Sequence, residues 1–116
     1  MVTDKMARRI DYQDPTNIDH KALPLTIRSV FFIDPKRKIR TIISYPASTG
    51  RNASEVLRVV DSLQAGDKYK IATPIDWLPG QDVIVANSVP DPEAKELFPN
   101  FRTIKPYLRY TALPLA

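Results

Sequence analysis

"LTIRSVFFIDPKRKIRTIISYPASTGRNASEVLRVVDSLQ", residues 25–64, is the stretch that decides the fold. Residues 25–33 are rich in β-branched and aromatic side chains, and residues 39–45 repeat this character after the turn signal DPKRK. Two such runs joined by a short polar loop predict a β-hairpin over 25–45, with Asp34 and Pro35 at the first two positions of the turn. The VFFI end of the first strand is apolar on both faces, which is typical of an interior strand.

The second half of the same stretch predicts a helix over about 52–65. Asn52 followed by Glu55 is close to a capping box, apolar residues then recur at helical spacing, and Gly66 is the expected stop. The free amide groups of the first turn, with Arg51 just before them, make an anion or polar-ligand site one interpretation. A solvated or carboxylate-paired arginine is the other, and the residues alone favour it.

The flanking regions are less regular. Residues 1–22 are polar, with DPTN at 14–17 as a turn signal. After Gly66, residues 73–85 alternate turn signals with a short strand. Asp91 as the cap, followed by Pro92 as the first helical residue, predicts a helix over 92–98. We expect residues 101–111 to be extended. We therefore expect an α/β (α+β) protein with a lead-in segment at 1–22, a core at 23–66 and an extension at 67–116.

The composition excludes several classes of function. The 116 residues are 43% hydrophobic and 26% charged, as in one small globular domain. They contain no cysteine, which excludes disulfides, thiolate catalysis and cysteine metal sites. The net charge of +4 is spread along the chain, and its densest part, Lys36 to Lys38, fits a solvated turn better than a phosphate-binding patch.

No apolar run approaches the roughly 18 residues that span a bilayer, and the N-terminus lacks the apolar core of a signal peptide. We expect no membrane association and, by default, a cytoplasmic location. His20 is the single histidine and lies in a polar segment, so a surface position is favoured over a metal site, and no metal or cofactor is expected. The serines lack the nucleophile elbow of hydrolases.

Two aromatic motifs have a functional and a packing interpretation. Tyr107, Arg109 and Tyr110 in PYLRY could interleave stacking and charge as in nucleic-acid binders. Trp77 beside a Pro-Gly turn could line an interface. Packing is favoured in both cases, and we expect no nucleic-acid partner.

The runs quoted above, with TPIDWLPGQDVIV (73–85) and EAKELFPNFRTIKPYLRYT (93–111), closely resemble the C-terminal half of the 1-Cys peroxiredoxins, especially the fungal mitochondrial type. The resemblance covers about residues 11–111. It implies a partial thioredoxin-like fold, made of the hairpin and the helix, followed by the peroxiredoxin C-terminal extension. It also implies completion of the fold by dimerisation and, through the mitochondrial relatives, a mitochondrial location as an alternative.

The resemblance gives Arg28 and Arg51 a role. In peroxiredoxins the matching arginines flank the peroxidatic cysteine, keep it as a thiolate and stabilise the charge that develops as the peroxide bond breaks. Tyr45 and Thr49 join them as ligand-binding candidates. The cysteine segment of the family precedes the matched region, so the resemblance implies that this chain alone is not a thiol peroxidase. The phospholipase activity of some members is not carried over, because Asp34 is shifted from the family position.

Three hypotheses stay open. The first is a truncated, cysteine-free peroxiredoxin-like protein that acts by association as a homodimer or with a full-length peroxiredoxin. The second is a repurposed small-molecule-binding protein or biosynthetic enzyme with a dimer pocket that contains Arg28 and Arg51. The third is a C-terminal fragment of an active peroxide-reducing antioxidant enzyme.

Overall fold

The structure is a computed structural model that describes residues 13–18 and 24–113. The chain divides into two compact units, Met1–Asn52 and Ala53–Ala116, and each is treated by itself. Both helices of the described residues belong to the second unit, whereas the sequence analysis grouped the first helix with the hairpin. The domain borders at residues 22 and 66 therefore stay a prediction.

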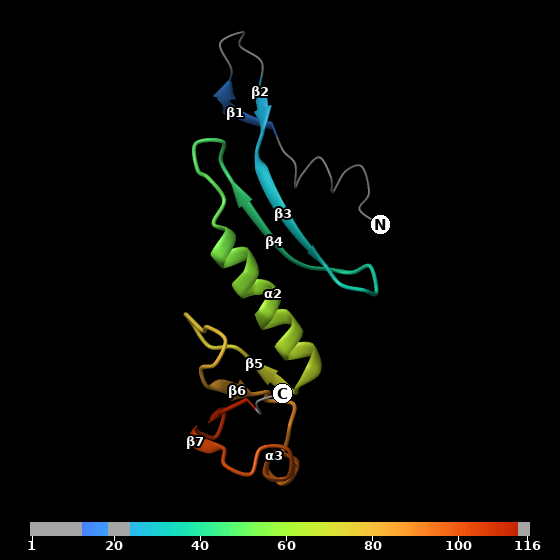
Figure 1. Ribbon diagram of the computed structural model, residues 1–116, viewed down its shortest axis with the longest axis vertical. Helices are drawn as coiled ribbons and strands as arrows, with labels where there is room; N and C mark the ends of the chain where they lie inside the picture. The colour runs from blue at the N-terminus through green and yellow to red at the C-terminus, as the bar shows by residue number, and fades with distance from the viewer. Residues whose placement is uncertain (1–12, 19–23, 114–116) are drawn as a thin grey trace. The chain divides into compact units, whose positions relative to one another are not determined.

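The first unit contains two antiparallel strand pairs, β1 with β2 and β3 with β4 (Figure 1). The β3–β4 pair is the predicted hairpin. The strands of this unit are β1 (Gln13–Ile18), β2 (Pro24–Thr26), β3 (Arg28–Ile33) and β4 (Ile39–Tyr45).

Two details of this unit differ from the sequence prediction. The prediction of a turn at DPTN (14–17) is wrong, because these residues lie in β1. The register of its pairing with β2 shifts between Asp14 and Ile18. Pro15 lies in this irregular part, where a strand can accommodate a residue that has no amide hydrogen to donate. The predicted strand over 25–33 is interrupted at Ile27, so that β2 and β3 pair with different partners.

The register of the hairpin decides which side chains share a face. Arg28 lies opposite Tyr45, Val30 opposite Ile43 and Phe32 opposite Thr41, on one face. Phe31 lies opposite Ile42 on the other face, next to Ser29 and Ser44, whose hydroxyl oxygens are 3.1 Å apart. Large apolar side chains therefore occupy both faces, and only Phe32, at 7% exposure, is buried.

The turn of the hairpin is the predicted four-residue turn. The Arg37 amide donates to the Asp34 carbonyl at 2.9 Å, and the Asp34 carboxylate accepts from the Lys38 amide at 2.9 Å. Arg37 has a φ of 63°, the left-handed conformation that closes such hairpins and leads into a bulge. The register shift between Phe32 and Ile33 is that bulge.

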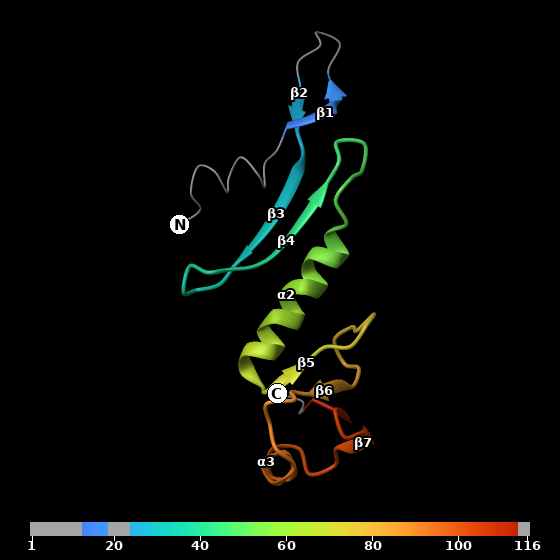
Figure 2. The same ribbon diagram turned by 180° about the vertical axis from the view of Figure 1, so that it is seen from behind.

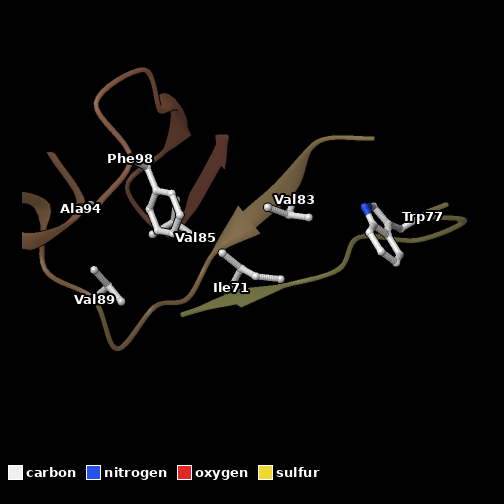
Figure 3. Close-up of a cluster of buried hydrophobic side chains, with 7 residues drawn as sticks. All are labelled: Ile71, Trp77, Val83, Val85, Val89, Ala94 and Phe98. Carbon is white, nitrogen blue, oxygen red and sulfur yellow. The ribbon is translucent and has the colours of Figure 1, made fainter. Parts of the chain in front are cut away.

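The second unit joins α2 to a small antiparallel sheet with strand order β5-β6-β8-β7 (Figure 2). Its core contains Trp77, two alternate residues of β6, one residue of α3 and Phe98 just after that helix, as Figure 3 shows. The elements are α2 (Ala53–Lys68), β5 (Ile71–Ala72), β6 (Val83–Val85), α3 (Asp91–Leu97), β7 (Arg102–Lys105) and β8 (Leu108–Thr111). The buried apolar core is Ile71, Trp77, Val83, Val85, Val89, Ala94 and Phe98.

The ends of both helices differ from the sequence prediction. Helix α2 starts where Asn52 predicts but runs through Gly66 to Lys68, and the Tyr69 amide still donates to the Ala65 carbonyl at 2.9 Å. Gly66 does not stop the helix, because its backbone keeps a conformation that residues other than glycine also adopt. In α3 the cap position belongs to Pro90, not Asp91, so the predicted helix is one residue out of place.

Candidate functional site

The predicted ligand site begins at the open end of the β3–β4 hairpin. Arg28 at the start of β3 lies directly across from Tyr45 at the end of β4, and both side chains are half-buried. The Arg28 guanidinium donates a long hydrogen bond of 3.4 Å to the Thr26 carbonyl. The structure thus brings two of the four candidates together on one face of the hairpin.

The other two candidates lie in the turn that follows β4. The Thr49 amide donates to the Pro46 carbonyl at 3.0 Å, which closes a tight turn, and the side chains of Thr49 and Arg51 are exposed. No carboxylate whose side chain the structure describes pairs with Arg28 or Arg51. Two guanidinium groups that have no acidic partner among the described side chains are suited to binding an anion or a polar ligand. The roles of all four residues stay predictions.

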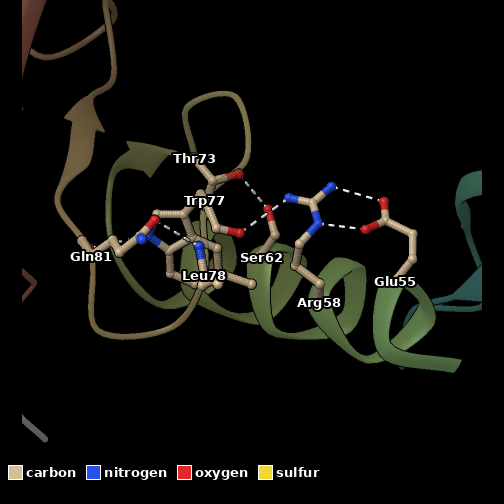
Figure 4. Close-up of polar contacts among 7 residues, drawn as sticks. All are labelled: Glu55, Arg58, Ser62, Thr73, Trp77, Leu78 and Gln81. Atoms are coloured by element: carbon tan, nitrogen blue, oxygen red, sulfur yellow. Dashed lines mark hydrogen bonds and ion pairs between the residues drawn. The ribbon is translucent and has the colours of Figure 1, made fainter.

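A second polar cluster, not foreseen from the sequence, links α2 to the loop 73–82 (Figure 4). The Arg58 guanidinium contacts both carboxylate oxygens of Glu55, at 2.6 and 2.8 Å, and donates to the Trp77 carbonyl at 3.3 Å. The hydrogen bond from Arg58 holds the pKa of Glu55 below its usual value, and the same bond raises the pKa of Arg58. The i, i+3 spacing of Glu55 and Arg58 could have suggested the pair, but the Trp77 carbonyl is a tertiary contact.

The loop itself is closely hydrogen-bonded. The Trp77 indole donates to the Gln81 carbonyl at 3.1 Å, and the Gln81 side chain accepts from the Leu78 amide at 3.1 Å. The Trp77 side chain is 2% exposed, which confirms that it packs. The hydroxyls of Ser62 and Thr73, 2.5 Å apart, make a further link from α2 to the start of the loop.

Arg109 on β8 is the buried cation of the second unit, at 4% exposure. It donates to the Val89 carbonyl at 2.6 Å and the Ala86 carbonyl at 3.1 Å, and contacts the Asp91 carboxylate at 2.8 Å. The Asp91 side chain thus pairs with Arg109, while the cap position of α3 belongs to Pro90. For the PYLRY motif, the prediction that the side chains pack is therefore confirmed for Arg109 and wrong for Tyr107, which is 68% exposed.

Other predicted features have little structural counterpart. His20 lies outside the described residues. Among the residues that the structure describes, no group of three or more histidine or acidic side chains is arranged to hold a metal ion. None of their helices is long and apolar enough to cross a bilayer.

The comparisons with known proteins agree on one family. The family model described as the C-terminal domain of 1-Cys peroxiredoxin matches residues 62–100. The mitochondrial peroxiredoxin of Saccharomyces cerevisiae is 54% identical over 102 residues, which is 88% of this chain and 39% of the relative. Peroxiredoxin-6 of Gallus gallus is 46% identical over 116 residues, or 95% of this chain and 52% of the relative. The chain matches the C-terminal part of the 1-Cys peroxiredoxins.

Solved peroxiredoxin structures agree with this result. A cysteine-to-serine mutant of peroxiredoxin 6 from Arenicola marina superposes with a TM-score of 0.86 and 45% identity, over 97% of this chain and 53% of that one. A yeast mitochondrial 1-Cys peroxiredoxin, studied for thiol resolution via glutathione and thioredoxin systems, gives a TM-score of 0.73 and 58% identity. The superposition covers 74% of this chain and 40% of that one. The predicted mixed α/β, partial thioredoxin-like fold and the predicted peroxiredoxin resemblance, including its fungal character, are confirmed.

The 1-Cys peroxiredoxin match is partial in length. The chain spans about half, or less, of the curated peroxiredoxins it matches. Its 116 residues contain no cysteine. The peroxiredoxin part described here therefore holds candidate arginines but not the thiol after which the family is named.

Proposed function

We propose that these residues form a cysteine-free peroxiredoxin-type module that acts by association, with a second copy or with a cysteine-containing peroxiredoxin, and does not reduce peroxide on its own. The observation that carries the proposal is the β3–β4 hairpin, which has large apolar residues on both faces and a single buried one, Phe32. A two-stranded sheet is marginal by itself, and its open edges and apolar faces favour pairing with another chain.

Light scattering on the purified chain tests this proposal. A sharp species near twice the 13.2 kDa chain mass supports self-association. Mixing the chain with a full-length 1-Cys peroxiredoxin and measuring the mass of the product tests the second partner. A monomer at every concentration, together with no binding to the full-length protein, would falsify association as the function.

Binding of a small anionic or polar ligand is a second candidate, favoured by the lack of a described carboxylate partner for Arg28 and Arg51. Titration calorimetry with inorganic sulfate as the probe is the first test. We expect Arg28→Ala and Arg51→Ala each to weaken binding about tenfold or more, because each removes one full charge from the site. Equal affinities for the parent chain and both variants would contradict this candidate.

A contribution to peroxide reduction is the third candidate, supported by the peroxiredoxin relatives. Here Arg28 and Arg51 would flank a cysteine supplied by residues outside this chain and stabilise its thiolate. The test combines this chain with the cysteine-bearing N-terminal half of the yeast relative and measures peroxide consumption. Activity that needs both parts and falls about tenfold or more with Arg51→Ala supports the candidate, and activity indifferent to Arg51 opposes it.

The mitochondrial name of the yeast relative supports a mitochondrial location as the alternative to the cytoplasmic default. Fluorescence imaging of the gene product, tagged at its C-terminus in its native organism, distinguishes the two.

A further inference from the structure

Residues 48–54, with the sequence STGRNAS, form the longest run of exposed residues in the part of the chain that the structure describes. The run follows β4, and its last two residues are the first two of α2. The border between the two compact units falls within it, after Asn52. Exposed connecting segments are where modifying enzymes gain access to a chain, because binding there disrupts little packing.

Ser54 places a hydroxyl group in this run. The residue is exposed, and its hydroxyl makes no hydrogen bond to a residue that the structure describes. Other serines differ: the hydroxyls of Ser29 and Ser44 lie 3.1 Å apart, and the Ser62 hydroxyl lies 2.5 Å from that of Thr73. The Ser54 hydroxyl can therefore react without the loss of a described hydrogen bond.

Arg51 lies three residues before Ser54, and none of the other serines of the chain follows an arginine at this spacing. Arg51 is exposed, and no carboxylate whose side chain the structure describes pairs with it. Residues 41–54 contain no aspartate or glutamate. One class of serine kinases selects substrates by holding an arginine at this position against carboxylates, which a guanidinium contacts through two parallel hydrogen bonds. An exposed arginine in a segment free of acidic residues fits that recognition.

We propose that Ser54 is the phosphorylation site of a serine kinase that recognises Arg51. The kinase and a nucleoside triphosphate are the co-reactants. The Ser54 Oγ forms a bond to the γ-phosphorus, and the bond from that phosphorus to the oxygen of the leaving nucleoside diphosphate breaks. The hydroxyl proton passes to the catalytic carboxylate of the kinase. The first turn of a helix opens at small cost, so Ser54 can enter an extended substrate groove.

A phosphate on Ser54 changes the contacts of the first turn of α2. It adds a charge of about −1.5 to −2 near the start of the helix, where negative charge is stabilising. Arg58 lies four residues further along the helix and contacts both carboxylate oxygens of Glu55 (Figure 4). Because residues four apart are neighbours on a helix surface, the phosphate competes with Glu55 for the Arg58 guanidinium.

The same phosphate acts on Arg51, the candidate for binding an anion. Three residues span at most about 11 Å, close to the screening length of about 8 Å at physiological ionic strength. A phosphate on Ser54 therefore lowers the attraction of Arg51 for a second anion. This consequence rests on the proposed ligand binding and makes it a process that a kinase switches off.

Phosphorylation of the purified chain tests the site. A calmodulin-dependent serine kinase, which selects an arginine three residues before its acceptor, is the probe, with ATP as the phosphoryl donor. Mass spectrometry measures the rate at each serine. We expect Ser54 to react at least about tenfold faster than Ser48, an exposed serine of the same run without such an arginine. Arg51→Ala should slow the reaction at Ser54 about tenfold or more, since it removes the bidentate contact.

Two results would overturn the site. One is a rate at Ser54 that is no higher than that at Ser48 or that is unchanged by Arg51→Ala. The other is a synthetic peptide of residues 45–58 that reacts while the folded chain does not, because the fold then withholds the serine from the kinase.

Sulfate titration of the phosphorylated chain tests the regulatory consequence. We expect affinity for sulfate about tenfold lower than that of the parent chain, and kinase treatment of Ser54→Ala should leave the affinity unchanged. Equal affinities with and without the phosphate would overturn the regulation. A parent chain that binds no sulfate would overturn the ligand candidate and its regulation together, whereas Ser54 as the modified residue is decided by the kinase experiment alone.

Discussion

At the scale of single residues, Arg109 shows how a charge can become part of a core. Its guanidinium satisfies the Ala86 and Val89 carbonyls and reaches the exposed Asp91 carboxylate. Its Nε is a buried side-chain nitrogen without a hydrogen-bond partner. The residue therefore ties β8 to the segment before α3 at the cost of one unsatisfied donor.

We expect Arg109→Met to lower the free energy of unfolding by about 2–3 kcal/mol, because it leaves carbonyl groups in the core without donors. Asp91→Asn should cost less than about 1 kcal/mol, since its side chain is 70% exposed and water can replace the ion pair. Urea unfolding of the two variants measures both values. A loss with Asp91→Asn as large as that with Arg109→Met would mean that the ion pair, and not the carbonyl contacts, is the important interaction.

The Glu55–Arg58 pair makes a prediction about pH. The pKa of Glu55 is lowered in the folded chain, chiefly by its hydrogen bond from Arg58. A carboxyl with a depressed folded pKa stabilises the fold above its unfolded pKa, about 4.3, and loses this contribution as pH falls through the folded value. Glu55→Gln should therefore flatten the acid side of the stability curve, measured by unfolding at intervals from neutral to acidic pH. Parallel curves for the parent and variant chains would contradict the assignment.

At the scale of elements, two glycines with opposite conformations should respond oppositely to alanine. Gly66 lies inside α2, and an added Cβ would meet the Ile71 carbonyl oxygen at an ordinary 3.6 Å. Gly80 has a φ of 97°, which alanine adopts only with strain.

Gly66→Ala should raise the free energy of unfolding by about 0.5–1 kcal/mol, through helix propensity and a less flexible unfolded chain. Gly80→Ala should lower it by about 1 kcal/mol or more and loosen the loop 73–82. Thermal unfolding of the two variants beside the parent chain gives both signs in one experiment. A destabilising Gly66→Ala would indicate that α2 ends earlier than Lys68.

The elements also show what could be predicted from sequence. Alternating β-branched runs around Asp34 and Pro35 predict the hairpin, and the Asn52 signal predicts the start of α2, because these depend on neighbouring residues. Gly66 as a stop and DPTN as a turn were wrong, because helix continuation and strand pairing overrode local preference. The Arg58 and Arg109 contacts join residues 18 to 23 positions apart, so no local pattern indicates them. The candidate site was predicted through the family resemblance, and its residues still await a test.

At the scale of the whole molecule, the two units differ in how well they are packed. The second unit has a seven-residue core with Val83 and Val85 at 0% exposure. The first has Phe32 as the one buried apolar residue whose side chain the structure describes. Stability should therefore be uneven along the chain, with the lowest values in the hairpin.

Amide hydrogen exchange measures this difference. We expect the amides of β6 and β8 to exchange at least about 100-fold more slowly than those of β3 and β4 in dilute solution, because opening them disrupts a packed core. Raising the protein concentration should slow exchange in β3 and β4 selectively if association covers the hairpin. Uniform exchange across both units would contradict the uneven packing, and hairpin exchange independent of concentration would contradict association through it.

The strand order β5-β6-β8-β7 has a consequence for synthesis of the chain. Strand β8 is made after the other three, yet it lies between β6 and β7 and is the one strand that pairs with both. On a ribosome, the second unit therefore cannot close its sheet until Leu108–Thr111 has left the exit tunnel. Until then β7 has no strand to pair with, and the core around Val83 and Val85 is incomplete on one side. We expect this unit to fold late and in a single step, and chaperones to bind its still unfolded segments before that step.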